Sequence, residues 1–68
     1  MNDRLLRLPE VEGITGLKRS TIYMMAQEGT FPRPVKLTKR SSAWRNSEIQ
    51  QWIDSREVAV NDRFKKKI

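Results

Sequence analysis

The sequence predicts a mainly α-helical domain that carries a small β-hairpin. A glycine turn at Gly16 separates a short helical segment from a longer amphipathic one. Two short segments of apolar and basic residues, 35–37 and 43–45, flank a polar turn and suit the two strands of a hairpin. A further amphipathic segment follows Asn46. With 68 residues and no cysteine, the chain can form one small core that packing alone must stabilise.

The first helix is expected to follow an extended arm, residues 1–7, and to end at Thr15. Pro9 suits the first helical position, where a missing N–H costs nothing. Val11 and Ile14 form the predicted inward face. Because this helix is short and contains a glycine, tertiary packing must hold it in place.

The second helix is predicted to begin at Lys18 or Arg19 and to run to Glu28, with Gly29 as a left-handed C-terminal cap. Its buried stripe follows the i, i+3, i+4 spacing: Ile22, Met25 and Ala26. The opposite side carries hydrogen-bonding groups, and the first turn is basic. A helix of this kind after a glycine turn is typical of a helix-turn-helix, whose second helix enters the DNA major groove. An ordinary helical hairpin with a solvated outer face is the alternative.

Residues 30–34 form a stiff connector, since two prolines forbid a helix there. We expect Phe31 to fill the core rather than to stack on a base. The hairpin that follows is interpreted as a two-stranded wing, anchored on the helices by Leu37 and Trp44. Its tip carries Lys39 and Arg40 among hydroxyl groups and no acid, which suits contacts with phosphates. The fold is thus predicted to be a winged helix-turn-helix of three helices and a two-stranded wing.

Two sets of candidate DNA-binding residues follow from this interpretation. The set on the recognition helix lies at its start and on its outward face: Lys18, Arg19, Ser20, Thr21, Tyr23, Met24 and Gln27. The set on the wing and the backbone near it is basic or hydroxylic: Arg33, Lys36, Thr38, Lys39, Arg40, Ser41 and Arg45. Among the first set, Arg19 and Gln27 have the side chains that pair best with guanine and adenine.

The third helix is predicted to open at residues 46–47, with Ser47 and Gln50 in the pattern of a capping box. Its buried stripe is Ile49, Trp52 and Ile53, continued less regularly by Arg56 and Val60. Residues 1–60 are taken as the domain. Residues 61–68 are basic with little to pack, and we expect a disordered tail.

The positive charge is concentrated in the middle of the chain. Between residues 18 and 45, seven basic residues face a single acidic one, whereas the seven basic and seven acidic residues elsewhere cancel. The whole net charge of +6 therefore lies on the recognition helix and the segment after it. Such a concentration favours a polyanionic partner, because each phosphate that is neutralised releases counterions. We expect this partner to be double-stranded DNA.

Other function classes lack their characteristic residues. Without histidine and cysteine the usual zinc ligands are missing, and no carboxylate pair has a supporting constellation, so neither a metal, a cofactor nor an enzymatic activity is predicted. The glycines do not have the spacing of a phosphate-binding loop. The apolar runs are too short for a membrane helix and the N-terminus does not resemble a signal peptide, so we expect a cytoplasmic protein without a small-molecule ligand.

The motifs of the chain, taken in order, resemble the AlpA family of small prophage-associated transcriptional regulators. They are RLPEV at residues 7–11, TGLKRSTIY at 15–23, GTFPRPVKL at 29–37, Trp44, and SEI with WI in the third helix. The resemblance implies a MerR-like, excisionase-like winged helix-turn-helix that acts at an integrase or excision promoter, or at an attachment site. Three residues depart from the family pattern: Lys18 replaces a frequent serine, Met24 a common arginine, and Glu28 a frequent basic residue.

Several interpretations remain open on the sequence alone. An excisionase that bends DNA is one alternative, a basic module that binds an acidic protein is another, and RNA binding is a third, although no aromatic platform supports it. The third helix is too short for a long dimerising coiled coil. We therefore expect a monomer or weak dimer that binds repeated sites cooperatively.

Overall fold

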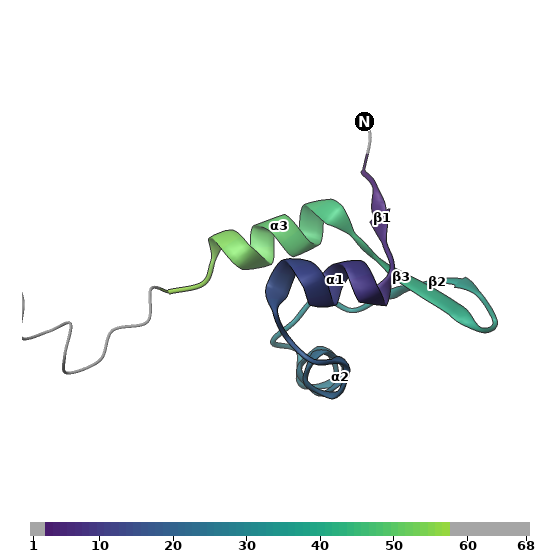
Figure 1. The fold of residues 1–68 in the computed structure, drawn as a ribbon, viewed down its shortest axis with the longest axis horizontal. Helices are drawn as coiled ribbons and strands as arrows, with labels where there is room; N and C mark the ends of the chain where they lie inside the picture. Colours follow the sequence, from purple (N-terminus) through teal and green to yellow (C-terminus); the bar gives the residue numbers. More distant parts are fainter. Residues whose placement is uncertain (1–2, 58–68) are drawn as a thin grey trace, which may run out of the picture.

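The computed structural model describes residues 3–57 of the chain. The elements in chain order are β1 (Leu5–Leu6), α1 (Leu8–Thr15), α2 (Arg19–Glu28), β2 (Val35–Thr38), β3 (Ser41–Arg45) and α3 (Asn46–Asp54). Helices α2 and α3 lie at opposite ends of the molecule with α1 between them, and the β2–β3 hairpin projects to one side (Figure 1). The predicted arrangement of three helices and a hairpin is confirmed. The predictions for Val60 and for residues 61–68 lie outside the described residues.

A third strand joins the hairpin. The sheet has the order β1-β3-β2, and both neighbouring pairs are antiparallel. Strand β1, predicted only as an extended arm, pairs Leu5 with Arg45 and Leu6 with Trp44. A strand of two residues is too short for alternation to reveal it in the sequence. Its partner strand β3 is therefore the central strand, with a neighbour on each side.

The hairpin closes through the two residues Lys39 and Arg40, since Thr38 pairs with Ser41. The register is irregular between Lys36 and Thr38, which leaves Leu37 as an extra residue. Leu37 is 42% exposed, so its prediction as an anchor of the wing is wrong. The irregularity lies where the hairpin extends beyond the helices, and an apolar side chain has little to pack against there (Figure 1).

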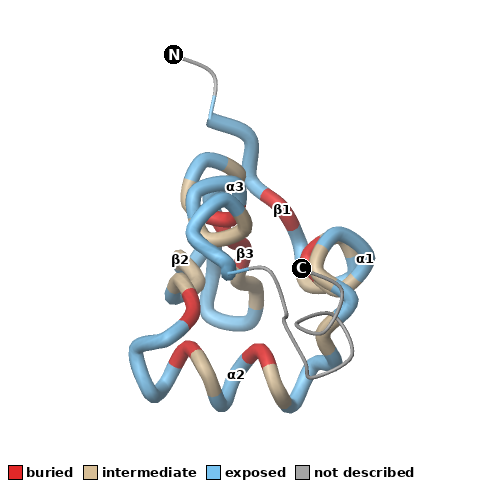
Figure 2. The backbone as a smooth tube through the Cα atoms, turned by 90° about the vertical axis from the view of Figure 1, so that its left-hand side faces the viewer, coloured by how far each residue is buried: buried red, intermediate tan, exposed pale blue. Residues whose placement is uncertain are grey.

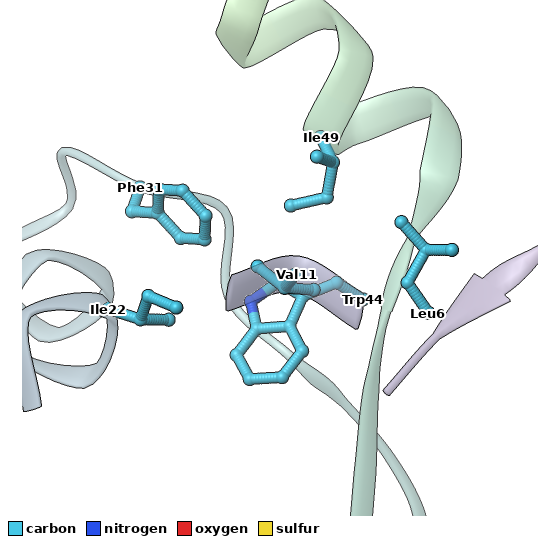
Figure 3. Close-up of a cluster of buried hydrophobic side chains, with 6 residues drawn as sticks. All are labelled: Leu6, Val11, Ile22, Phe31, Trp44 and Ile49. Atoms are coloured by element: carbon cyan, nitrogen blue, oxygen red, sulfur yellow. The ribbon is translucent and has the colours of Figure 1, made fainter. Parts of the chain in front are cut away.

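Trp44 is fully buried in the core, which confirms its prediction as an anchor of the hairpin. The cluster brings together six buried side chains from both ends of the molecule: Leu6, Val11, Ile22, Phe31, Trp44 and Ile49 (Figure 3). The indole Nε1 of Trp44 donates a hydrogen bond of 2.8 Å to the carbonyl oxygen of Pro32, which satisfies its one polar group. The prediction of Phe31 as a core residue is confirmed. Its ring meets Trp52 edge-on, with 4.8 Å between the ring centroids.

Helix α1 ends at Thr15 and Gly16 adopts a left-handed φ of 75°, as the glycine turn predicted. Two details differ. The helix begins at Leu8, so that Pro9 occupies the second helical position. Ile14 is 45% exposed, because the buried face of α1 extends from Val11 toward Leu8 and Thr15 and not toward Ile14. At about 100° per residue, Leu8 and Thr15 lie about 60° and 40° to one side of Val11, and Ile14 about 60° to the other.

Helix α3 is capped from a distant part of the chain. Asp3 accepts hydrogen bonds from the Ser47 backbone N–H at 2.9 Å and from the Ser47 hydroxyl at 2.7 Å. The predicted capping box is therefore wrong: the N-cap residue is Arg45, and the Gln50 amide instead meets the Asn46 side chain at 3.5 Å. The hydrogen bonds from Ser47, backbone first, hold the pKa of the Asp3 carboxyl below its usual range, with a smaller contribution from the positive charge of Arg45.

The buried stripe of α3 agrees with the prediction over its first two turns. Ile49 is buried, and Trp52 and Ile53 are half-buried against the core. The helix ends at Asp54, and Arg56 does not continue the stripe. Its side chain is exposed and lies over the Trp52 ring, with 4.4 Å between the guanidinium carbon and the ring centroid.

Candidate nucleic-acid interface

Helix α2 has the bounds and the caps that the sequence predicted. Lys18 is the N-cap residue, with an extended backbone and no side-chain capping bond. At the other end Gly29 adopts a φ of 87°, and the Thr30 N–H donates a 2.9 Å bond to the carbonyl oxygen of Met25. The C-terminal end of α2 is therefore determined by the two residues that follow it in the sequence.

The outward face of α2 is exposed, and one of its side chains, Tyr23, also contacts Trp44 of the core. Ile22 and Ala26 are buried on the side toward the other elements, and the exposed residues lie on the opposite side (Figure 2). The exposed candidates are Lys18, Arg19, Ser20, Tyr23, Met24 and Gln27. Thr21 is half-buried and lies at the margin of this face. The predicted separation into an inward and an outward face is confirmed.

Tyr23 packs against a residue of the core, Trp44. Its ring centroid lies 5.9 Å from that of Trp44, with the planes tilted by 52°. Tyr23 itself is 42% exposed. An aromatic ring held on a rigid neighbour loses little rotamer entropy on binding, so Tyr23 can present its hydroxyl group in a defined position.

The hairpin adds positive charge beside α2. Lys36 pairs with Ser42, and Ser42 lies on the same sheet face as Trp44, two residues further on. Since Tyr23 of α2 contacts Trp44, this register places Lys36 on the face that α2 covers. At the tip, Thr38, Lys39 and Arg40 are exposed and Ser41 is half-buried, and the Arg40 N–H donates to the Thr38 hydroxyl at 3.2 Å.

Two candidates of the wing set lie elsewhere. Arg45 is next to Trp44 in β3 and so lies on the other sheet face, paired opposite Leu5. Arg33 donates from Nε to the carbonyl oxygen of Ala26, at 3.4 Å. Both line a groove of about 870 Å³ between the connector of residues 29–35 and α3, together with Trp52 and Arg56. The structure therefore leaves the recognition-helix residues on the exposed face of α2 and the hairpin tip exposed where the hairpin projects from the helices, and it separates Arg33 and Arg45 from both.

Within the described residues, no cation of α2 or of the hairpin forms an ion pair with a carboxylate. Within residues 3–57 the one ion pair joins Arg4 to Glu10 at 2.6 Å, away from α2 and the hairpin. The same part of the chain contains no group of acidic, histidine or cysteine residues that could hold a metal ion, and no helix in it is long and apolar enough to span a bilayer. Its buried side-chain polar atoms all have a hydrogen-bond partner.

Sequence reasoning missed the groove and the role of Asp3. The groove residues come from the connector, the end of β3 and α3, and no motif of the sequence joins them. The available signal was Phe31 in the run FPRP at residues 31–34, which combines an aromatic side chain, two prolines and an arginine. Asp3 lies 44 residues from Ser47, and no local pattern indicates a contact at this separation.

Comparisons with known proteins agree with this geometry. Residues 4–57 match the family model described as "Prophage CP4-57 regulatory protein (AlpA)". The uncharacterized protein ORF88 of Enterobacteria phage P4 is 44% identical over 54 residues, which cover 79% of this chain and 61% of that protein. The DNA-binding transcriptional activator AlpA of Escherichia coli strain K12 is 37% identical over 59 residues, covering 78% of this chain and 84% of that protein. The chain thus spans less than two thirds of the phage P4 relative.

Proposed function

Because the chain belongs to the AlpA family of prophage regulatory proteins, we propose that it is a sequence-specific DNA-binding transcription regulator of a prophage or integrated element. The match of residues 4–57 to the family model confirms the family resemblance of the sequence motifs. The chain is a regulatory protein rather than an enzyme. The proposed targets are an integrase or excision promoter, or an attachment site. The relative from Escherichia coli is named a DNA-binding transcriptional activator, which supports this function.

The observation that carries the proposal is the unobstructed outward face of α2 beside a basic hairpin. A helix N-terminus with Lys18 and Arg19 attracts phosphate and guanine, and both side chains are exposed. In this proposal α2 lies in the major groove, where Arg19 and Gln27 contact base edges and Tyr23 lies between them along the helix. Lys36, Lys39 and Arg40 then contact the sugar-phosphate backbone beside it.

The oligomeric state and the location follow from the same proposal. The described part of the chain offers α3 of nine residues, too short for an extended coiled coil. We propose a monomer or weak dimer that acts in the cytoplasm and binds repeated sites cooperatively.

The test of this function combines selection and mutation. Duplexes selected from a random pool by the parent protein, followed by footprinting on DNA upstream of its own locus, give the specific site. Arg19→Ala is expected to weaken binding to that site by about 1–3 kcal/mol, because one bidentate contact with a base is lost. Binding to random duplex should change much less, since it depends on phosphates.

The matched control is Arg56→Ala, which removes one exposed arginine that follows α3 and does not belong to α2 or the hairpin. This variant should bind the selected site as the parent does. An equal loss for Arg19→Ala on selected and random duplex would place Arg19 on the phosphate backbone. Failure to select any preferred sequence would contradict the function itself.

A further inference from the structure

We propose that the groove between the connector of residues 29–35 and α3 binds a carboxylate-rich segment of a partner protein, while α2 remains free to hold DNA. The groove has a volume of about 870 Å³ and is widely open to solvent. Its lining contains none of the residues of α2 and none of the hairpin tip. The proposed function does not assign this surface to any partner.

The groove combines an apolar floor with a cationic rim. Pro34 and Trp52 supply the apolar surface, and the edge-on contact of Trp52 with the buried ring of Phe31 makes this part rigid. Trp52 is held further by its indole N–H, which donates to the carbonyl oxygen of Thr30 at 2.8 Å. A rigid aromatic floor suits an apolar side chain of an extended peptide.

Three arginines surround this floor: Arg33, Arg45 and Arg56. None of them forms an ion pair within residues 3–57. Two are already held in place, because Arg33 donates to the Ala26 carbonyl oxygen and Arg56 lies over the Trp52 ring while donating to the Trp52 carbonyl oxygen at 3.2 Å. Each keeps guanidinium N–H groups for a carboxylate, and pre-positioned guanidinium groups lose little entropy when they bind one.

The shape and chemistry of the groove favour a peptide over a second stretch of DNA. The exposed face of α2 points away from α3 (Figures 1 and 2), so a duplex held on α2 lies away from the α3 wall of the groove. The wall also contains Glu48, whose carboxylate can accept a peptide N–H, a donor that the phosphate backbone of DNA does not have. Phosphates alone would leave the apolar floor uncovered. An acidic peptide with an apolar residue satisfies the floor, the arginines and the glutamate together.

The test measures binding of a short fluorescent peptide of Asp and Glu residues around a central leucine to the full chain. Its counterpart with Asn and Gln in place of the acids serves as the charge control. The groove variant carries Arg33→Gln, Arg45→Gln and Arg56→Gln, and the DNA-face variant carries Lys18→Gln, Arg19→Gln and Lys39→Gln, so that both lose the same net charge.

The acidic peptide should bind the parent and the DNA-face variant with the same affinity. Its affinity for the groove variant should be lower by about tenfold or more. The groove variant should keep its preference for the selected duplex, and the parent should bind peptide and duplex together. An equal loss of peptide binding in both variants would reduce the effect to overall charge and overturn the proposal. Loss of duplex binding in the groove variant would make the groove a DNA surface.

A separate measurement guards against misfolding of the triple variant. Arg45→Gln alone removes a side chain that forms no hydrogen bond within residues 3–57, and it leaves the contacts of Arg33 and Arg56 intact. The indole N–H resonance of Trp52 reports on the groove. It should shift when the acidic peptide is added to the parent, and a higher peptide concentration should be needed in Arg45→Gln. An unshifted resonance in the parent would contradict the site.

Discussion

At the scale of single residues, Trp44 connects the helices to the sheet. Its ring is fully buried, its indole N–H bonds to the connector at Pro32, and its ring lies against Tyr23 of α2. Trp44→Ala is therefore expected to cost about 3–5 kcal/mol of unfolding free energy, because a large cavity would remain in a small core. For a domain of this size that is most of its stability. Urea and thermal unfolding measure it directly.

Leu37→Ala is the matched control within the same hairpin. Leu37 is exposed at the irregular position of β2, so its truncation should change the unfolding free energy by about 0.5 kcal/mol or less. If Leu37→Ala destabilised the protein as much as Trp44→Ala, the hairpin would pack on the helices in a different register.

At the scale of elements, α3 depends on a residue that precedes the first strand. The Asp3 carboxylate accepts two hydrogen bonds from Ser47, which keep its pKa below the usual range. The folded state therefore favours the charged form of Asp3. The resulting stability is present above the unfolded pKa of about 3.9 and is lost as the pH falls through the lower pKa of the folded state.

The comparison of the parent with Asp3→Asn isolates this contribution. The urea midpoint of the parent should be higher than that of Asp3→Asn at neutral pH. This difference in midpoint should vanish in acid, because the Asp3 carboxyl of the parent becomes protonated. Glu10 and the other carboxylates are common to both proteins, so their contributions to the pH dependence of stability cancel in the comparison. A difference that stays constant with pH would show that Asp3 acts through hydrogen bonding without its charge.

The hairpin tip is the element for which we expect contacts with phosphates. Lys39 and Arg40 are exposed at the turn and have no carboxylate partner within residues 3–57. Because charge attraction is less directional than a hydrogen bond to a base edge, the tip can contact phosphates without exact positioning of its side chains. The Lys39→Ala, Arg40→Ala double variant should flatten the plot of log affinity against log salt by about two units. Sequence preference should persist, and an unchanged slope would mean that the tip points away from DNA.

The elements that the sequence predicted well are those whose determinants are local. Helix α1 is capped at its end by Gly16 and helix α2 by Gly29, and the α2 stripe of Ile22 and Ala26 defines a face without help from other segments. The missed features depend on distant partners. The pairing of β1 with β3 and the cap from Asp3 to Ser47 join residues about forty apart, where no periodicity operates.

The candidate site likewise has a part that the sequence predicted and a part that it did not. The outward face of α2 follows from helical periodicity, and it was predicted residue by residue. Arg33 and Arg45 were grouped with the wing because they are close to it in the sequence, but strand alternation and the turn of the connector place them in the groove. In a hairpin, one step along the strand moves a side chain to the other face, so proximity in sequence does not predict a shared surface.

At the scale of the whole molecule, the position of the charges is expected to matter more than their sum. The groove variant and the DNA-face variant defined above each lose three positive charges and so have the same net charge. If total charge governed DNA binding, both would show the same loss of salt dependence. If the α2 face and the hairpin hold the duplex, only the DNA-face variant should change.

Salt titrations of the two variants on random duplex decide between these cases. The slope of log affinity against log salt should fall by about 1.8 units in the DNA-face variant, since Lys18 and Lys39 each lose a phosphate contact of about 0.9, whereas Arg19 contacts base edges. The groove variant should keep the slope of the parent, because Arg33, Arg45 and Arg56 line a groove that contains no residue of α2 or of the hairpin tip. Equal falls in both variants would show that the duplex also reaches the groove, and the charge on both surfaces would then serve DNA.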